Sequence, residues 1–403
     1  MNILVLNSGS SSIKFNLWKI EAKQLLCKGI IEKIGKKDSS MTYCPNGGKI
    51  VFEIELLNHK DGIQFVLDTI TDCNNGVVKS IKDIDAVGHR VVHGGERITQ
   101  SELVTKEIEK IIEECIMLAP LHNPANLEGI RAIGNVLPDV PNIAVFDTAF
   151  HSTMPPKAYV YPLPYEFYEK YKIRKYGFHG TSHKYVSLRG AEILGLKPNK
   201  FNCITCHLGN GSSIAAVKNG LSVDTTMGFT PLAGLPMGTR TGSIDPSIIL
   251  YMIENLGYEP KAVNDILNKE SGFKGISGIS SDLREVSKAA KEGHVRAILT
   301  LKIFAHAAKK FIAGLATEME GRVDAIIFTG GIGENSSESR ELICEGLQIF
   351  GAQIDLEKNT FIKGEGFISQ DDSEISILVI PTNEELMIAL ETQRIVDAKK
   401  KVK

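Results

Sequence analysis

The sequence predicts an α/β protein whose two halves resemble each other. Short runs of β-branched or aromatic residues, bounded by turn residues, alternate with helical patterns along the whole chain. Two Gly/Ser/Asn turns, Asn7–Ile13 and Gly209–Ile214, each follow an apolar strand-like run. A similar strand and turn in each half suggest a duplicated domain. With 403 residues, the chain is long enough for two or three domains of roughly 150 residues.

The predicted strands are short and apolar. They share β-branched or aromatic residues and have turn residues at their ends. In chain order they are Ile3–Leu6, Ala86–Val87, Ile143–Phe146, Cys203–Cys206, Ile214–Val217, Ala325–Phe328 and Ile375–Ile380.

Helical patterns occur between and after these strands. Val104–Leu118 has one apolar face and stops before Pro120, which predicts an amphipathic helix. Val295–Met319 is apolar nearly all round, which predicts a buried helix. The segment after Pro381 predicts a final helix that extends to about Asp397.

Composition restricts the class of protein. The 43% hydrophobic and 23% charged fractions are typical of a globular chain and exclude disorder as the main state. Lysine plus arginine, 46, against 48 acidic residues leaves a net charge of −2, which argues against a basic surface for nucleic acid. No apolar run approaches the ~18 residues of a membrane helix, and the N-terminus has no secretory pattern. Seven sparse cysteines suit reduced thiols, so we expect a cytoplasmic protein.

The first Gly-rich turn has the composition of a phosphate cradle. Gly9 lets a ligand approach the backbone closely, while neighbouring serines and Lys14 can donate to phosphoryl oxygens. A polar β-hairpin turn is the competing interpretation. The turn lacks the spacing of a Walker loop.

Two further Gly-rich turns, His207–Ser213 and Thr329–Asn335, also follow apolar strands. A nucleotide laid across a crevice needs several close backbone approaches, so three such turns favour a nucleotide site. The third turn does not have the G-x-G-x-x-G spacing, and we therefore predict no dinucleotide fold.

Two arginines and one aspartate have unusual sequence contexts. Arg90 follows a strand and precedes two glycines, and Arg240 lies in the Gly/Pro/Thr-rich loop Thr230–Asp245. An arginine in such a loop can present its planar fork to a carboxylate or a phosphate. Asp147 lies just after a strand, where α/β folds place functional acids. Surface arginines and a solvated turn aspartate are the competing interpretations.

Other metal and haem motifs are weaker. His179 and His183 have the spacing of a zinc pair, but the glutamate of H-E-x-x-H is absent, so we do not predict zinc there. Cys203, Cys206 and His207 match the c-type haem pattern and also offer a redox dithiol. We favour a buried strand that leads into a Gly-rich turn. The sequence has no export signal to support covalent haem and no second C-x-x-C to complete a zinc site.

Glu384 follows the last predicted strand, within Pro381–Glu385. A carboxylate at a strand end beside a phosphate site can hold Mg²⁺, often through water. An acidic first turn of a helix is the competing interpretation, because a carboxylate suits the helix dipole there.

Taken together, these motifs resemble the acetate kinase family almost from end to end. The matching stretches follow the family's order and spacing: Asn2–Phe15, Gly88–Glu96, Pro120–Asn126, Phe146–Met154, Tyr176–His183, His207–Ala215, Asp224–Asp245, Ser281–Arg284, Phe328–Asn335 and Pro381–Leu386. The resemblance implies an α/β fold of two similar actin-like (ribonuclease H-like) domains that flank a nucleotide cleft. It implies an N-terminal domain at 1–150, joined by a C-terminal helix at 386–403, and a nucleotide-binding C-terminal domain at 151–385.

The resemblance also implies roles for individual residues. The family's catalytic positions match Arg90, Asp147, His179 and Arg240, and its magnesium positions match Asn7 and Glu384. Substrate binding matches Arg90 together with an apolar pocket for the acetate methyl group, formed by Val92, Leu121, Phe178 and Pro231. Nucleotide binding matches Ser10, Ser12, Lys14, His207, Leu208, Gly209, Asn210, Gly211, Asp282, Leu283, Arg284, Gly330, Gly331, Ile332, Gly333 and Glu334.

The implied activity is reversible transfer of the γ-phosphoryl group of ATP to acetate, giving acetyl phosphate and ADP. The resemblance implies Mg²⁺ as the cofactor, with Mn²⁺ as a substitute, direct in-line transfer, and a homodimer. The expected partners are these small molecules, with no nucleic acid and no membrane.

Three alternatives remain open. A propionate or butyrate kinase would use the same mechanism with a larger pocket, although Val92 favours acetate because propionate-preferring relatives tend to have a smaller residue there. An actin-like ATPase could serve as a filament or chaperone module. A haem or redox protein could be built on Cys203 and Cys206.

Overall fold

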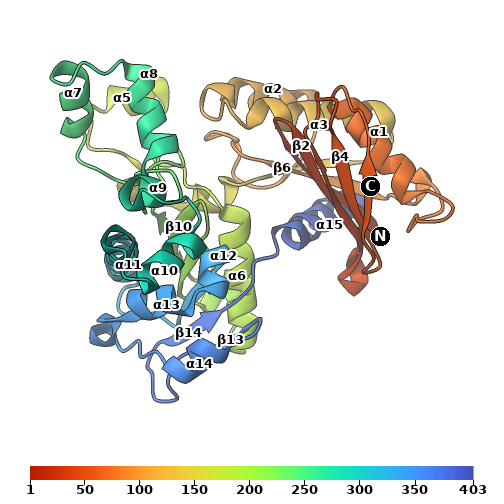
Figure 1. Cartoon of the computed structure of the whole chain (residues 1–403). Helices are drawn as coiled ribbons and strands as arrows, with labels where there is room; N and C mark the ends of the chain where they lie inside the picture. The colour runs from red at the N-terminus through yellow and green to blue at the C-terminus, as the bar shows by residue number, and fades with distance from the viewer. Residues whose placement is uncertain (403) are drawn as a thin grey trace. The chain divides into compact units, whose positions relative to one another are not determined.

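The computed structural model describes residues 1–402, and these divide into two compact units. Unit 1 contains Met1–Ser152 together with the chain from Asn383 onward, and unit 2 contains Thr153–Thr382. Each unit has one sheet (Figure 1). Buried apolar side chains of each unit form its own core. None of the helices in the described part of the chain combines the length and apolar character that a membrane span requires.

Unit 1 is built on an eight-stranded sheet with the order β5-β4-β3-β2-β1-β6-β8-β7. The strands from β5 to β1 are antiparallel neighbours, whereas β1, β6 and β8 run parallel. The strand bounds are β1 Asn2–Gly9, β2 Ser12–Lys19, β3 Gln24–Glu32, β4 Ser40–Pro45, β5 Ile50–Glu53, β6 Ala86–Val91, β7 Glu102–Leu103 and β8 Asn142–Phe146.

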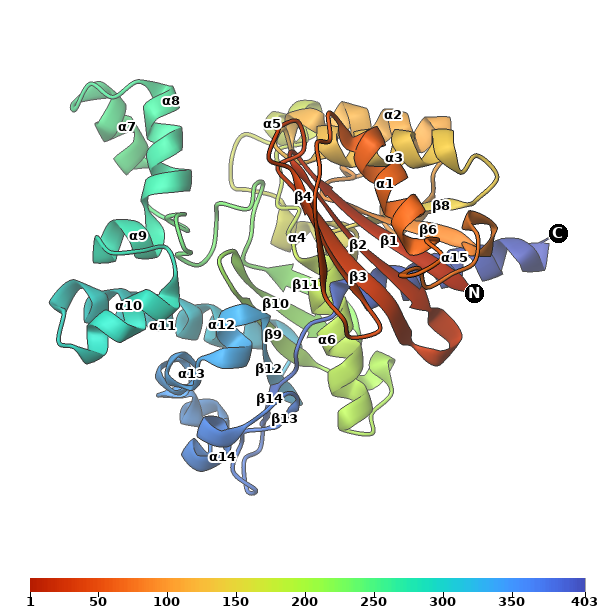
Figure 2. The same ribbon diagram turned by 45° about the vertical axis from the view of Figure 1, so that its right-hand side comes forward.

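Helices cover both faces of the sheet in unit 1. On one face lie α1 (His59–Ile70), α2 (Lys106–Glu114) and α3 (Asn123–Val136), and on the other lies α15 (Glu384–Val402), as Figure 2 shows. Side chains alternate between the faces of a strand. Leu4 and Leu6 of β1 join the core beneath α1 and α3, so Asn7 lies on the face toward α15.

Unit 2 repeats the central strand order of unit 1. Its six-stranded sheet has the order β11-β10-β9-β12-β14-β13. The antiparallel β11-β10-β9 matches β3-β2-β1, and the parallel β12 and β14 match β6 and β8. The strand bounds are β9 Cys203–Leu208, β10 Ser212–Lys218, β11 Leu221–Thr225, β12 Ala325–Thr329, β13 Gly366–Phe367 and β14 Ser376–Val379. This repetition confirms the predicted α/β class and explains the similar turns of the two halves.

The sheet of unit 2 is likewise covered on both faces. Alternate residues of β9, Ile204 and Cys206, join the apolar core that includes α11 (Val295–Ala316). Thr205 points the other way and contacts His183 of α6 (Gly180–Ile193). The remaining helices are α4 Pro156–Tyr159, α5 Glu166–Tyr171, α7 Ser247–Glu254, α8 Pro260–Asp265, α9 Gly272–Ser277, α10 Leu283–Lys291, α12 Gly330–Asn335, α13 Ser337–Cys344 and α14 Leu356–Phe361.

The prediction that Val295–Met319 is a buried helix was wrong in one respect. The helix forms, but Val295 is 77% exposed and Leu299 is also exposed. Only one face of α11, which includes Phe304 and Ile312, packs into the core. An apolar side chain on the outer face of a helix is common in folded proteins, so composition alone could not distinguish the two faces.

Candidate active site

The first Gly-rich turn is a tight hairpin between β1 and β2. Gly9 pairs with Ser12, so Ser10 and Ser11 form the connection. Asn7 pairs with Lys14 directly across the two strands. Directly opposed residues share one face of a sheet, so the Asn7 and Lys14 side chains lie together on the face toward α15.

Arg90 and Asp147 form a close ion pair at the carboxyl ends of β6 and β8. Nη2 of Arg90 donates to Oδ2 of Asp147 at 2.6 Å, and Nε of Arg90 lies 3.2 Å from both carboxylate oxygens. Asp147 is buried, whereas Arg90 keeps a quarter of its side chain exposed. The Asp147 charge raises the pKa of Arg90 above its usual value, which fixes the arginine as a cation with an oriented plane.

Glu384, the first residue of α15, has a buried carboxylate oxygen that lacks a partner. Oε1 of Glu384 has no hydrogen-bond partner among the described residues. Burial raises the pKa of Glu384 to about 7, against the opposing effect of Arg90 and with the help of Asp147 and Glu385. A bound cation would relieve this cost, because it would compensate the buried charge.

These groups fit a magnesium ion. No cluster of three or more His, Cys, Asp or Glu side chains in the described part of the chain could hold a metal. Mg²⁺ does not require such a cluster, because it usually keeps several waters and binds one or two carboxylates beside substrate phosphates. The unpartnered oxygen of Glu384 and the amide oxygen of Asn7 are suitable ligands.

Two asparagines of the Pro120–Asn126 motif support this part of unit 1. Oδ1 of Asn126 accepts from the Val92 N–H at 3.1 Å, and Nδ2 of Asn126 donates to the Ser8 carbonyl at 2.8 Å. Asn123 bonds both backbone groups of His93. Asn126 therefore joins the end of β1 to the segment after β6, and Asn123 fixes His93 in that segment. Sequence reasoning identified the motif but not this role.

The predicted apolar pocket residues of unit 1 differ in exposure. Val92 is buried, whereas Leu121 is 76% exposed. Val92 is fixed through its backbone by Asn126, so its side chain has a defined position two residues beyond Arg90. Leu121 lies in the turn before α3.

In unit 2, His179 occupies the N-cap of α6 in a left-handed conformation, with φ of 57°. A non-glycine residue in this region is uncommon and often marks a functional site. Nδ1 of His179 lies 2.9 Å from Oγ of Ser213, which lies 2.7 Å from Nε2 of His183. The ring of His207 lies 4.3 Å from that of His179, centroid to centroid.

A second hydroxyl chain fixes His207. Oγ of Ser182 lies 2.8 Å from Nδ1 of His207 and 2.8 Å from Oγ1 of Thr382. Sequence reasoning missed Ser182, Thr382, Ser213 and Thr205. The available signal was the period of the strand, which puts Thr205 and His207 on one face, toward α6.

Arg240 and His179 converge on the second Gly-rich turn. A Cβ atom added to Gly211 would lie 3.4 Å from Nε2 of His179 and 3.6 Å from Nη1 of Arg240. Nη1 of Arg240 donates to the Pro231 carbonyl at 3.3 Å. No described carboxylate forms an ion pair with Arg240, and burial lowers its pKa. A half-buried guanidinium without an acidic partner is suited to an anionic ligand.

The third Gly-rich turn begins α12 directly after β12. Gly330 has φ of 76°, and an added Cβ would lie 2.7 Å from the Leu208 carbonyl oxygen, so only glycine fits. Oε1 of Glu334 accepts from the N–H groups of Gly330 and Thr382 at 2.9 and 3.1 Å. Buried Arg340 donates to the carbonyls of Gly333 and Glu334. The turn is therefore held from both ends.

The predicted adenosine residues 282–284 begin α10. The Asp282 carboxylate caps the helix at the Arg284 N–H and also binds the Arg284 guanidinium at 2.6 Å. Leu283 is buried in the core, so only its backbone can reach a ligand. The side chain of Arg284 remains exposed.

The histidine and cysteine motifs have structural explanations. Nδ1 of His183 lies 2.7 Å from the Thr205 hydroxyl, and Nε2 of His183 lies 2.7 Å from the Ser213 hydroxyl. Both nitrogens through which His183 could bind zinc are therefore already hydrogen-bonded. Cys203 and Cys206 both lie on the buried strand β9, as predicted. Cys206 belongs to the core beneath α11, and an odd separation of three residues puts Cys203 on the opposite face. The two thiols therefore cannot act together.

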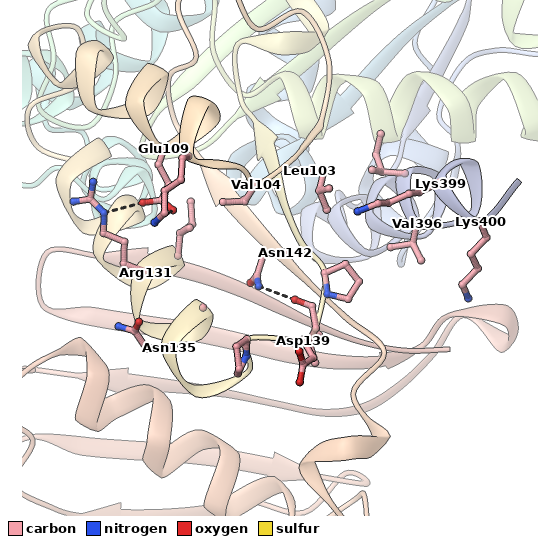
Figure 3. Close-up of a pocket in the computed structure, with 17 residues that line it drawn as sticks. Leu103, Val104, Glu109, Arg131, Asn135, Asp139, Asn142, Val396, Lys399 and Lys400 are labelled. Carbon is pink, nitrogen blue, oxygen red and sulfur yellow. Dashed lines mark hydrogen bonds and ion pairs between the residues drawn. The ribbon is translucent and has the colours of Figure 1, made fainter. Parts of the chain in front are cut away.

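A separate cavity of about 750 Å³ lies elsewhere in unit 1 (Figure 3). It is lined by residues of α2, α3 and α15 and by Pro138–Asn142, the segment that leads into β8. Arg131 binds Glu109 in its wall at 3.1 Å. Ligand sites of α/β sheets lie at the carboxyl ends of the strands, and this cavity lies at the amino end of β8, opposite Asp147.

The chain is similar to known proteins over nearly its whole length. A family model described as the acetokinase family matches residues 2–390. The acetate kinase of Caldanaerobacter subterraneus is 56% identical over 398 residues, which cover 98% of this chain and 99% of that protein. A crystal structure of Porphyromonas gingivalis acetate kinase has a TM-score of 0.94 and 45% identity, with 98% and 99% coverage. A propionate kinase from Francisella tularensis has a TM-score of 0.91 and 47% identity, with the same coverage.

Proposed function

This chain belongs to the acetokinase family, and from that premise we propose that it catalyses reversible transfer of the ATP γ-phosphoryl group to acetate. The products are acetyl phosphate and ADP, and the enzyme is a phosphotransferase with a carboxyl group as acceptor. The observation that carries the proposal is Arg240, a half-buried cation that has no carboxylate partner among the described residues and that lies, like Nε2 of His179, beside Gly211. Such a group is placed to bind an anion that the chain itself does not supply.

Direct in-line transfer requires no general base. A carboxylic acid of this kind titrates near ~4, so acetate is already an ionised nucleophile at neutral pH. Both reactants are anions, and their repulsion is the main obstacle to approach. Phosphoryl transfer therefore depends on alignment and on charge neutralisation.

The proposal assigns this neutralisation to three residues and the orientation of one of them to a fourth. Arg90 and Arg240 bind the carboxylate and the equatorial phosphoryl oxygens. His179 donates from Nε2 to the transferring group. Asp147 orients Arg90, which the ion pair at 2.6 Å supports.

The metal role falls to Asn7 and Glu384. When bound, Mg²⁺ neutralises charge on the terminal phosphates, and Mn²⁺ is expected to substitute for it. The unpartnered oxygen of Glu384 supports this assignment. Lys14 lies across from Asn7 and adds a cation on the same sheet face.

The nucleotide is proposed to contact the Gly-rich turns. Ser10, Ser12 and residues 207–211 would bind phosphates, and residues 282–284 and 330–334 would lie at the adenosine. Because Glu334 already bonds two backbone N–H groups, its part is to shape the turn, while the backbone of Gly331 and Ile332 approaches the ligand.

Acetate is the proposed acceptor, with propionate as the second candidate. Val92, Phe178, Pro231 and Leu121 are assigned to the methyl group. The similarity to a propionate kinase at 47% identity favours overlap between the two acids. One methylene is worth only about 1–3 kcal/mol in an apolar pocket, so moderate discrimination is expected.

We also propose a homodimer that uses the face of α7. Every residue of α7 is at least partly exposed, although the helix sequence is largely apolar. Its exposed apolar side chains and those that follow it are Ile248, Leu250, Tyr251, Leu256 and Tyr258. A group of exposed apolar side chains of this kind is typical of a protein interface, and a second copy of the chain is the expected occupant.

A hydroxamate assay of acyl phosphate formation tests the proposed activity. Purified protein is supplied with ATP and Mg²⁺ and with acetate, propionate or butyrate, and GTP and pyrophosphate are tested as alternative donors. Product formation that depends on the carboxylate, and is fastest with acetate, is expected. ATP hydrolysis at the same rate without any carboxylate would contradict the proposal and favour an actin-like ATPase.

A further inference from the structure

A chain of hydrogen bonds ends at Nδ1 of His179 and bears on which ring nitrogen of this residue carries the hydrogen. The chain runs from Thr205 through His183 and Ser213 to His179, and we name it the His179 relay. Thr205, His183 and Ser213 are all fully buried, so water cannot replace any of these bonds. The inference rests on the proposed role of His179 as a donor to the transferring phosphoryl group.

The relay joins groups from three elements of unit 2. Oγ1 of Thr205 on β9 lies 2.7 Å from Nδ1 of His183 on α6. Nε2 of His183 lies 2.7 Å from Oγ of Ser213 on β10, and Oγ of Ser213 lies 2.9 Å from Nδ1 of His179. Each distance is that of a well-formed hydrogen bond.

A neutral chain of this kind has two possible directions. Each hydroxyl has one hydrogen, and each neutral imidazole carries a hydrogen on one nitrogen only. If Thr205 donates to His183, then His183 donates to Ser213, Ser213 donates to Nδ1 of His179, and His179 keeps its hydrogen on Nε2. If the chain runs the other way, Nε2 of His179 has a lone pair and cannot donate.

The surroundings of Thr205 select the first direction. In the reverse direction its hydrogen would have to go to the Ala215 carbonyl, which lies 3.4 Å away. This distance is well beyond the usual range of an O–H···O bond, whereas His183 lies at 2.7 Å. In the first direction, the one hydrogen outside a short bond of the relay is that on Nε2 of His179, a half-buried side chain that water or a ligand can reach. In the reverse direction it would be the hydroxyl hydrogen of fully buried Thr205, which makes the first direction the more stable one.

We propose that Thr205, His183 and Ser213 are positioning residues that hold His179 in the tautomer with its hydrogen on Nε2. That nitrogen faces Gly211 and Arg240, where an anionic ligand would lie. A lone pair there would repel a phosphoryl oxygen, whereas an N–H stabilises it. Fixing a histidine tautomer through the other ring nitrogen is a general device for orienting a catalytic imidazole.

Nitrogen NMR of the full-length protein tests the tautomer directly. Protein labelled with ¹⁵N-histidine is recorded without ligands, and the His179 signals are assigned by their loss in His179→Gln. We expect a protonated Nε2 and an unprotonated Nδ1 at neutral pH. A hydrogen on Nδ1 would overturn the proposal, whatever the activity of the protein.

Variants at Thr205 separate positioning from packing. Thr205→Val keeps the shape but removes the donor, so we expect a second His179 tautomer and a fall in kcat of about 2-fold if the tautomers become equally populated. Thr205→Ser keeps the hydroxyl and should restore both the spectrum and kcat. Equal spectra for wild type, Val and Ser would refute the relay.

Ser213→Ala acts closer to His179 and keeps the test decisive if Thr205→Val does not fold. We expect kcat to fall about 10-fold or more, with KM for acetate and ATP nearly unchanged, as when a supporting partner of a functional group is lost. An unchanged kcat would contradict the proposal. A wild-type protein that shows the Nε2 tautomer but makes no acyl phosphate would refute the proposed function and not the relay.

Discussion

At the scale of single residues, Arg90 and Arg240 differ in how their charge is compensated. The charge of Arg90 is compensated by the carboxylate of buried Asp147, which also fixes the plane of the Arg90 guanidinium. Among the residues that the structure describes, the contacts of Arg240 are the Pro231 carbonyl and the Met237 thioether near Nη1. A ligand anion would therefore gain more from Arg240, because that charge is desolvated and is not neutralised by the protein.

The first prediction concerns Arg240. Arg240→Ala should lower kcat about 10³-fold, because it removes charge stabilisation from the transition state. The kcat of Arg240→Lys should lie between those of Arg240→Ala and wild type, because lysine keeps the positive charge but lacks the planar guanidinium. The hydroxamate assay measures kcat for both variants.

Arg131→Ala is the matched control for this experiment. Arg131 lies in the separate cavity of unit 1 and is exposed, so activity should remain near wild type. An Arg240→Ala protein that folds and retains most of its activity would remove Arg240 from the mechanism.

The second prediction concerns pH and His89. Burial lowers the pKa of His89 from 6.5 to about 4, although its Nε2 bonds Oδ1 of Asn142 at 2.8 Å. The unfolded chain then binds a proton that the folded chain does not. The stability contributed by neutral His89 is therefore complete above pH 6.5 and is lost as the pH falls toward 4.

Urea denaturation at pH 7.5 and pH 5 measures this effect. We expect wild type to lose stability at the lower pH, and His89→Gln to lose less, because glutamine does not titrate. His306 is exposed, and His306→Gln should behave like wild type. An identical pH dependence for His89→Gln and wild type would contradict the assignment.

At the scale of elements, α15 reaches the sheet of unit 1 through a close contact with β6. A Cβ atom on Gly88 would lie 2.8 Å from Cγ2 of Ile388 and would also meet Oγ1 of Thr392. Both contacts come from α15, whose first residue is Glu384. The missing side chain at Gly88 therefore allows the helix to place Glu384 near Arg90 and Asp147.

The third prediction follows from this contact. Gly88→Ala should destabilise the protein by about 1–3 kcal/mol, because the added methyl group overpacks the interface with α15. Urea denaturation provides the measurement. Gly134→Ala in α3 is the control, since no atom lies within 4 Å of its added Cβ. The control should stabilise by about 0.4–1 kcal/mol, and equal effects of the two substitutions would exclude tight packing at Gly88.

Helices and strands were predicted best where the local residue pattern alone determines the secondary structure. Every predicted strand forms, because β-branched runs bounded by turn residues are local signals. The helix Val104–Leu118 also forms, as α2 with a short helical turn after it. The exposed face of α11 could not be predicted, because exposure depends on which side meets the sheet and not on the helix sequence.

At the scale of the whole molecule, unit 2 has an apolar surface on α7 that its own core does not use. Figures 1 and 2 both show α7 and α8 projecting from the sheet of unit 2. Leu250 of α7 is 56% exposed. A charged residue introduced there should oppose burial against a second chain.

The fourth prediction is that Leu250→Arg converts the dimer to a monomer. Light scattering after size-exclusion chromatography measures the molar mass, which should fall to that of one chain. Ile349→Arg is the control, because Ile349 is 81% exposed in a different segment of unit 2 and should leave the mass unchanged. A wild-type protein that elutes as a single chain would exclude the homodimer. A Leu250→Arg protein that remains dimeric would place the interface elsewhere.

The candidate site was only partly predictable. Sequence motifs selected Arg90, Asp147, His179 and Arg240, because a charged or imidazole side chain beside a Gly-rich turn or a strand end is unusual. They did not show that Arg90 binds Asp147, which lies 57 positions away, or that Ser213 links His179 to His183. The opposite faces of Cys203 and Cys206 could have been predicted, since strand period alone separates them.

By itself, the sequence determined the α/β class, the positions of the strands and turns, and the family. These properties depend on local periodicity, on glycine at tight turns, and on a long series of motifs in order. The tertiary structure decided which groups become partners: the Arg90–Asp147 pair, the unpartnered oxygen of Glu384, and the direction of the His179 relay. The physical reason is that a hydrogen bond or ion pair depends on distance in space, which is set by how distant elements pack and not by spacing along the chain.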